Sequence, residues 1–213
     1  GMVERTAGTV STVETKKFFS TTAKSIDIAL SNTNLTATDT TDNGNGVAYL
    51  DPLDITKSNL YTELNLDAYV GNGGLEVGVC INNTYLSGYP SVNADAWGYR
   101  GGSSSALRHN NASIQSGAAL YNTSGKRVGI MYDYSTGVIN WYLDGVLQYT
   151  VTTTANTALY MYCWAERAGD GFTSVKPLYT PTSADYEAWS TKYQAPITAT
   201  TNIPTKAYFN KTI

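Results

Sequence analysis

Charged side chains are scarce in this chain of 213 residues. Asp, Glu, Lys and Arg make up 15% of it, against about 25% in typical soluble domains. The chain has 14 Lys and Arg against 17 Asp and Glu, and its basic residues form no cluster in the sequence. The sequence therefore gives no electrostatic basis for binding nucleic acid. No apolar run approaches the ~20 residues that a membrane-spanning helix needs. Neither a nucleic-acid partner nor membrane insertion is therefore expected.

Cysteine occurs only twice, as Cys80 in LEVGVCI and Cys163 in LYMYCWA. Free cysteine behaves as a small apolar residue, so we expect two buried thiols in these strand-like segments. A disulfide between neighbouring strands is the alternative, although two cysteines do not make a disulfide framework. No secretory signal is visible, and Gly1-Met2 has the form of a scar left by tag removal, so a native leader could have been trimmed.

The residues that catalysis needs are also few. His109 is the only histidine, and no G-x-S-x-G nucleophile pattern accompanies it. A retaining glycosidase needs two carboxylates about 5–5.5 Å apart, but the strand motif Glu-x-Asp-x-x-Glu is missing, and Glu63 and Asp67 would lie roughly 13 Å apart along a strand. One histidine and two separated cysteines make a zinc site improbable. We expect no enzyme and no cofactor, with a carbohydrate-active enzyme as a minor alternative.

A polar loop at residues 36–46, TATDTTDNGNG, offers the oxygen ligands that Ca²⁺ prefers. These are Asp39, Asp42, Asn43 and Asn45. Their spacing does not match an EF-hand, and Asn-Gly pairs are ordinary turn residues. A turn is the preferred interpretation and a calcium site is the alternative.

The abundant residues are Thr, Ser, Asn, Gly and Tyr, with 17 Tyr and 19 Gly. Thr and Tyr favour strands, while Gly and Asn favour tight turns, so the composition predicts an all-β protein. The most regular stretch is 126–152, KRVGIMYDYSTGVINWYLDGVLQYTVT. Its apolar runs at 128–133, 138–143 and 146–151 are separated by turn residues. The second turn is Asp144-Gly145, a strong hairpin signal, because the turn requires positive φ.

We therefore predict a three-stranded antiparallel meander over this stretch. Alternation along the middle strand places Ile139, Trp141 and Leu143 on one face and the intervening residues on the other. The first set is apolar throughout and is assigned to the core.

Further strands are predicted at 47–50, 60–70, 75–81 and 159–165. In the second of these, Leu60, Thr62, Leu64 and Leu66 form an apolar face. The opposite face is predicted to be wet and consists of Tyr61, Glu63, Asn65 and Asp67. The stretch 85–111, YLSGYPSVNADAWGYRGGSSSALRHNN, is predicted to be a loop region rich in aromatic and amide side chains. Many short strands with regular turn signals indicate a sandwich or barrel.

These aromatic loops supply the candidate ligand-binding residues. Aromatic rings pack on the CH faces of sugars, amides and arginine satisfy hydroxyl groups, and Tyr and Arg also dominate protein hot spots. The candidates are Tyr85, Tyr89, Tyr99, Arg100, His109, Asn110 and Asn111. A ligand role and an ordinary solvated loop are both open at this point.

Several segments, taken in order, resemble the successive signatures of SPRY-like domains. They are ALSNTNLTAT (29–38), LEVGVCI (75–81), YPSVNADAWGYRGG (89–102), LRHNN (107–111), KRVGIMYDYSTGVINWYLDGV (126–146) and LYMYCWAERAGDGFT (159–173). The resemblance covers residues 24–176 and is similar in flavour to SPRY-like modules of phage tail and virion proteins. In this family Trp97 is expected in the core.

The resemblance implies a bent two-sheet antiparallel β-sandwich of the concanavalin A-like jelly-roll kind at residues 24–180. It would have an N-terminal arm at 1–23 and a C-terminal extension at 181–213 with a short helix starting near Ser183. It also implies a non-catalytic module on a virion or extracellular surface, which binds a host glycan or protein through end loops. The alternative is a structural virion protein that associates with other subunits through its terminal arms. These subunits could be copies of the same chain, which would give a homo-oligomer.

Overall fold

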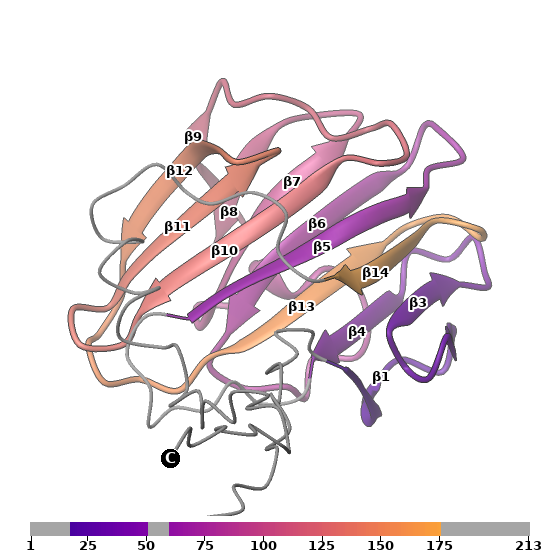
Figure 1. Ribbon diagram of the computed structural model, residues 1–213, viewed down its shortest axis with the longest axis horizontal. Helices are drawn as coiled ribbons and strands as arrows, with labels where there is room; N and C mark the ends of the chain where they lie inside the picture. The colour runs from indigo at the N-terminus through magenta and orange to yellow at the C-terminus, as the bar shows by residue number, and fades with distance from the viewer. Residues whose placement is uncertain (1–17, 51–59, 176–213) are drawn as a thin grey trace, which may run out of the picture.

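The computed structural model describes residues 18–50 and 60–175, and these form two antiparallel sheets of seven strands each. Figure 1 shows the sheets lying one over the other as a sandwich, which confirms the predicted fold class. Sheet A has the order β1 (Phe19–Lys24), β4 (Gly46–Leu50), β13 (Tyr160–Ala165), β6 (Gly74–Cys80), β7 (Ala96–Gly102), β8 (Ala106–His109), β9 (Ala112–Ser116). Sheet B has the order β12 (Val146–Thr152), β11 (Val138–Leu143), β10 (Arg127–Asp133), β5 (Leu60–Ala68), β14 (Gly171–Val175), β3 (Thr36–Asp39), β2 (Ile28–Ser31).

The predicted meander is confirmed as β10, β11 and β12. Asp144 and Gly145 have φ of 49° and 80°, as the tight turn between β11 and β12 requires. Ile139 and Trp141 have no exposed surface and Leu143 is 5% exposed, so this face of β11 lies in the core. The Trp141 indole N–H donates to the Val77 carbonyl at 3.2 Å and so joins the two sheets through the core.

The prediction of a loop over 85–111 was wrong in its second half, where β7 and β8 lie. The strand signal is weak there because β7 contains glycines at positions with no room for a side chain. A Cβ on Gly98 would lie 2.3 Å from the Glu76 side chain, and one on Gly101 would lie 2.5 Å from the Tyr121 ring. Larger neighbours fill the space, so glycine marks close packing here and not a turn.

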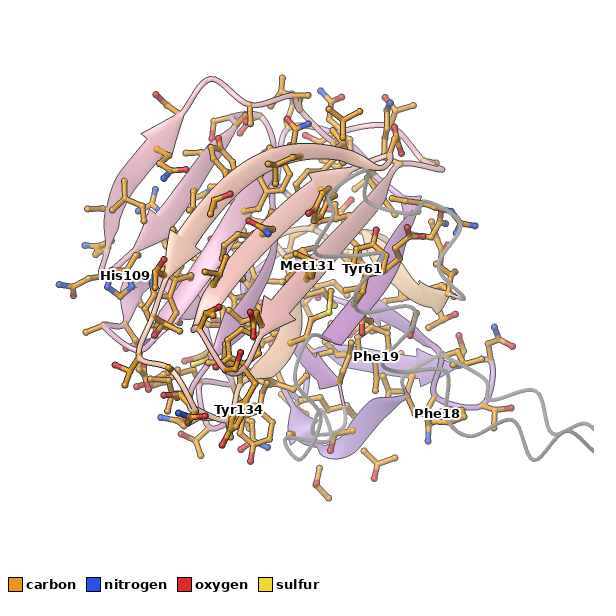
Figure 2. The ribbon with its side chains drawn as sticks, turned by 60° about the vertical axis from the view of Figure 1, so that its left-hand side comes forward. Phe18, Phe19, Tyr61, His109, Met131 and Tyr134 are labelled. Carbon is orange, nitrogen blue, oxygen red and sulfur yellow. The ribbon has the colours of Figure 1, made fainter. Side chains whose placement is uncertain are left out.

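The predicted wet face of β5 was also wrong for its first residues. Tyr61 and Glu63 are buried, whereas Asn65 is half-buried and Asp67 is exposed. Tyr61 packs with Met131 and Tyr142 on the outer side of sheet B, where Tyr61 and Met131 lie together (Figure 2). Glu63 is stabilised there because it accepts hydrogen bonds from the Tyr61 hydroxyl at 2.8 Å and from Arg127 at 3.1 Å.

Cys80 and Cys163 are free and buried, as expected. Cys80 points to the outer side of sheet A, whereas Cys163 belongs to the core between the sheets, so the two sulfur atoms lie on opposite faces of adjacent strands. Burial raises the pKa of the Cys80 thiol to about 12 and also raises that of Cys163. Both thiols are therefore protonated and unreactive near neutral pH.

The first described strand, β1, begins at Phe19, inside the range predicted as an N-terminal arm. The segments 1–17, 51–59 and 176–213 lie outside the described residues, and with them the helix predicted near Ser183. No helix within the described part is long and apolar enough to cross a membrane.

Trp141→Phe should lower the free energy of unfolding by about 2–4 kcal/mol, because it removes a buried hydrogen bond and leaves a smaller ring in a close-packed core. Urea denaturation followed by circular dichroism measures the loss. Val146→Ala, at a position 63% exposed in the next strand, is the control and should change stability by no more than about 0.5 kcal/mol. Equal losses in the two variants would contradict a central role for Trp141.

Candidate binding site on the outer face of sheet A

The loop at 81–95, between β6 and β7, lies against the outer face of sheet A. Its residues Tyr85, Leu86 and Tyr89 pack on a buried cluster that includes Tyr49, Tyr162 and Trp164. This second apolar layer lies outside the core between the sheets. The loop therefore forms part of the packed structure of the domain.

A buried carboxylate holds this loop in place. Glu76 of β6 is 0% exposed and accepts a hydrogen bond from the Ser91 hydroxyl at 2.7 Å and from the Tyr162 hydroxyl at 2.6 Å. Burial raises the pKa of Glu76, while the bonds from Tyr162 and Ser91 and the nearby Arg100 charge act in the opposite direction. Ser91 belongs to a short 3₁₀ turn, η1 (Pro90–Val92), so the anchor acts on the middle of the loop.

The Tyr89 ring is the centre of the exposed part of the site. The guanidinium carbon atoms of Arg100 and Arg108 lie 4.8 Å and 5.0 Å from its centroid. Trp164 meets it edge-on with a centroid distance of 5.3 Å, and Arg100 also lies 5.5 Å from the Trp164 ring. These cation–π distances fall within the ~6 Å range in which the interaction is favourable.

The turn between β8 and β9 completes the site. Asn110 and Asn111 have φ of 48° and 60°, which the tight turn requires. Their backbone N–H groups donate to the carbonyl oxygens of Asn93 and Ser91 at 3.3 Å and 3.1 Å. The turn and the loop are thereby bonded to each other, although about twenty residues separate them in the sequence.

The structure brings together five of the seven predicted residues at or near this surface: Tyr85, Tyr89, Arg100, Asn110 and Asn111. Tyr85 is half-buried, and its hydrogen bond to the Asp95 carboxylate raises its pKa. Whether these residues bind a ligand stays a prediction.

Two predicted residues lie elsewhere. Tyr99 is 0% exposed in the core, edge-on to Tyr121 and Tyr149, and its hydroxyl donates to the Ala119 carbonyl. It has no surface for a ligand and leaves the candidate set. His109 stacks on Trp97 with a centroid distance of 4.6 Å, and its Nδ1–H donates to the Ala96 carbonyl at 2.9 Å.

The side chains of His109 and Arg108 lie on opposite faces of sheet A, because successive residues of a strand point to opposite faces. Arg108 lies on the outer face with Tyr89. His109 lies on the core side at the margin of the sandwich, far from Phe18 and Phe19 (Figure 2). Trp97 is 9% exposed in the core, as expected for the family.

Three residues of the site were not predicted from the sequence: Glu76, Arg108 and Trp164. Each occupies an outward position of its strand, because side chains alternate between faces and the flanking residues of Glu76 and Trp164 belong to the core between the sheets. The alternation cannot show that these strands are neighbours in sheet A, which depends on the order of the strands in the sheet.

The loop predicted at 36–46 was wrong at its two ends, because residues 36–39 form β3 and Gly46 begins β4. The connection between these strands is hydrogen-bonded to other segments of the chain. The side-chain oxygens of Asp39, Asp42, Asn43 and Asn45 accept hydrogen bonds from the backbone N–H groups of Thr41, Ala168, Asn45 and Gly88, respectively, at 3.0–3.1 Å. The bond to Gly88 links this loop to the loop at 81–95. Within the described residues, no three His, Cys, Asp or Glu side chains come close enough to hold a metal ion. Each of the four side chains thus has a hydrogen-bonding role in the connection, as the turn interpretation predicts, although Asp39 Oδ2 is buried without a hydrogen-bond partner.

The fold and the anchored loop define a β-sandwich that presents a preformed surface built from its connecting segments. The SPRY domain model matches residues 60–178, more than half of the chain. The chain therefore belongs to the SPRY domain family. SPRY domains are protein–protein interaction modules and are generally non-catalytic.

Similar solved structures agree on the fold. The TRIM65 PSpry domain has a TM-score of 0.57 at 15% identity, covering 76% of this chain and 90% of its own. The SPRY domain of human HERC1 has a TM-score of 0.57 at 17% identity, covering 71% and 93%. Stonustoxin has a TM-score of 0.56 at 16% identity, covering 75% of this chain but only 27% of its own. At these identities the likeness shows the fold alone, and no curated protein matches the chain.

Ser91→Ala should loosen the loop at 81–95, because it removes the hydroxyl that donates to the buried Glu76 carboxylate. The expected loss of stability is about 1–3 kcal/mol, and amide hydrogen exchange in the loop should quicken. Ser87→Ala, at an exposed position of the same loop, is the matched control. If exchange rates in the loop were the same in both variants, Glu76 would not be its anchor.

A second prediction concerns Asp39 and Asp170, which are 1% and 0% exposed. Burial raises the pKa of both above the usual 3.8, and each is raised further by a neighbouring carboxylate: Asp27 beside Asp39, and Asp39 beside Asp170. The folded state therefore binds more protons than the unfolded state just above pH 3.8. Their contribution to stability is full below that pH and is lost as the pH rises through the folded-state pKa values.

Asp39→Asn should flatten this dependence, by at most about 1.4 kcal/mol per pH unit for each proton involved. Urea denaturation at a series of pH values measures the slope. Asp67→Asn removes a carboxylate from an exposed position of β5 and serves as the control. The same slope in wild type and Asp39→Asn would show that these buried carboxylates do not set the pH dependence.

Proposed function

We propose that this domain is a non-catalytic recognition module that binds a protein partner. The binding surface consists of the loop at 81–95 and the turn between β8 and β9. One observation carries the proposal: the loop is fixed from below by the buried Glu76 while Tyr89 and the two asparagines remain at the surface. A surface that is already ordered loses little conformational entropy on binding, so more of its contact energy becomes affinity.

The residue types at this surface support the same conclusion. Tyr and Arg are the side chains most often found at energetically important positions of protein interfaces, and Asn adds adaptable hydrogen bonding. The buried glutamates of the two sheets have structural partners. Glu63 is buried on the outer side of sheet B with Arg127, and Glu76 is buried on the outer side of sheet A beneath the loop.

We further propose that the domain works on a phage tail or virion surface and that its partner is a host-surface protein, with a host glycan as the alternative ligand. The low charge, the Thr- and Asn-rich surface and the resemblance to SPRY-like modules of phage tail proteins support this setting. The assembly alternative rests on terminal segments outside the described residues. Light scattering before and after deletion of residues 181–213 tests it.

The full chain should bind and enrich particular peptides from a random library displayed on yeast. Binding to a glycan array is measured in parallel, to test the alternative ligand. Tyr89→Ala should weaken binding of the enriched ligands at least about tenfold, because it removes the ring at the centre of the surface. Tyr134→Ala, at a half-buried tyrosine in the turn between β10 and β11, is the control and should bind as wild type does.

Equal binding by both variants would place the site elsewhere on the domain. Turnover of a polysaccharide by the purified protein would overturn the non-catalytic assignment.

A further inference from the structure

Arg108 has only neutral partners among the described residues. Its Nη2 donates to the Asn111 carbonyl at 3.3 Å, to Asn111 Oδ1 at 3.4 Å and to the Tyr89 hydroxyl at 3.5 Å. These distances lie at the long limit of hydrogen bonding. Its Nε is buried and has no hydrogen-bond partner. The guanidinium group is thus held in place but only weakly satisfied.

The charge around Tyr89 is unbalanced. Arg100 lies close enough to the buried Glu76 for its charge to lower the pKa of that carboxyl group. Arg100 thus has a carboxylate neighbour, whereas every hydrogen-bond partner of Arg108 among the described residues is neutral. The described ion pairs join Lys126 to Asp144 and Arg127 to Glu63, and neither includes Arg108. Within the described part of the chain, the Arg108 guanidinium therefore forms no ion pair.

The surrounding sequence supplies no acid that could balance it. Residues 96–116 contain Arg100 and Arg108 but no Asp or Glu. This range covers β7, β8 and β9, which form one end of sheet A. The nearby Asp95 is used within its own loop, where its Oδ2 accepts a hydrogen bond from Asn82 at 3.1 Å. Among the described residues, no acid forms an ion pair with Arg108, so its charge is open to a carboxylate supplied by a partner.

We propose that the partner bound at this surface is a protein segment that presents an Asp or Glu side chain to Arg108 beside the Tyr89 ring. This inference rests on the proposed function and names the chemistry of the partner. The planar guanidinium group matches a carboxylate through two parallel hydrogen bonds, which a lysine could not supply. The tyrosine ring already orients Arg108, so little side-chain entropy is lost when the pair forms.

The test is to select peptides from the yeast-displayed random library with the full wild-type chain and to sequence the enriched set. The same selection is made with three variants, and the enriched sets are compared. Peptides bound by the wild type should be rich in Asp and Glu and should weaken as salt is added. Arg108→Gln should weaken binding of these peptides at least about tenfold, and Arg108→Lys should fall between Arg108→Gln and the wild type. Lys24→Gln, on β1 at the opposite end of sheet A, removes the same charge and should bind as wild type does.

Arg108→Glu provides the reciprocal test, because peptides rich in Lys and Arg should replace the acidic ones in its enriched set. Thermal unfolding checks that every variant is folded. Tyr89-dependent peptides that carry no acidic residue, or that bind Arg108→Gln unchanged, would overturn the acidic partner and leave the proposed function standing. Arg108-dependent binding of acidic glycans alone would overturn the protein partner. If no ligand depends on Tyr89, both proposals fail.

Discussion

The architecture of the candidate site depends on one buried carboxylate. Glu76 has no exposed surface, and burying a carboxyl group is costly unless hydrogen bonds satisfy it. Ser91 and Tyr162 supply those bonds, one from the loop above the sheet and one from the neighbouring strand β13. The loop is thereby held as a fixed layer on the outer face of sheet A, with Tyr85, Leu86 and Tyr89 packed beneath it. Removing either donor would leave a buried acceptor without its partner, so the arrangement is held as a unit.

The fixed loop in turn positions groups from distant parts of the chain. Tyr89 comes from the loop, Arg100 from β7, Arg108 from β8 and Trp164 from β13. The last three each lie within about 6 Å of the Tyr89 ring. The backbone bonds between the β8–β9 turn and the loop add a second connection. A surface built in this way would need no rearrangement to meet the partner that we propose. That property suits a domain family that acts by contact and not by chemistry.

Local patterns predicted much of the fold. The meander of β10, β11 and β12 could be predicted because alternation and the Asp144-Gly145 turn act between near neighbours in the sequence. The two strands β7 and β8 could not, because Gly98 and Gly101 resemble turn residues until the side chains that fill their space are known. The burial of Tyr61 and Glu63 was missed for a related reason. A polar or aromatic residue on an outer face is buried only if other parts of the chain cover it and pair with it.

The residue patterns of the sequence determined an all-β protein, a sandwich or a barrel, with two cysteines expected to be buried and with all candidate residues in the aromatic-rich stretch 85–111. These features follow from periodicity, turn chemistry and composition, all of which are local, whereas the two-sheet sandwich was implied by the resemblance to SPRY-like domains. Only the tertiary structure separated Tyr89 from the buried Tyr99, turned Arg108 outward and His109 inward, and revealed Glu76 beneath the loop. Strand order and register decide which outward side chains become neighbours. That choice rests on contacts between residues far apart in the chain, which no local pattern records.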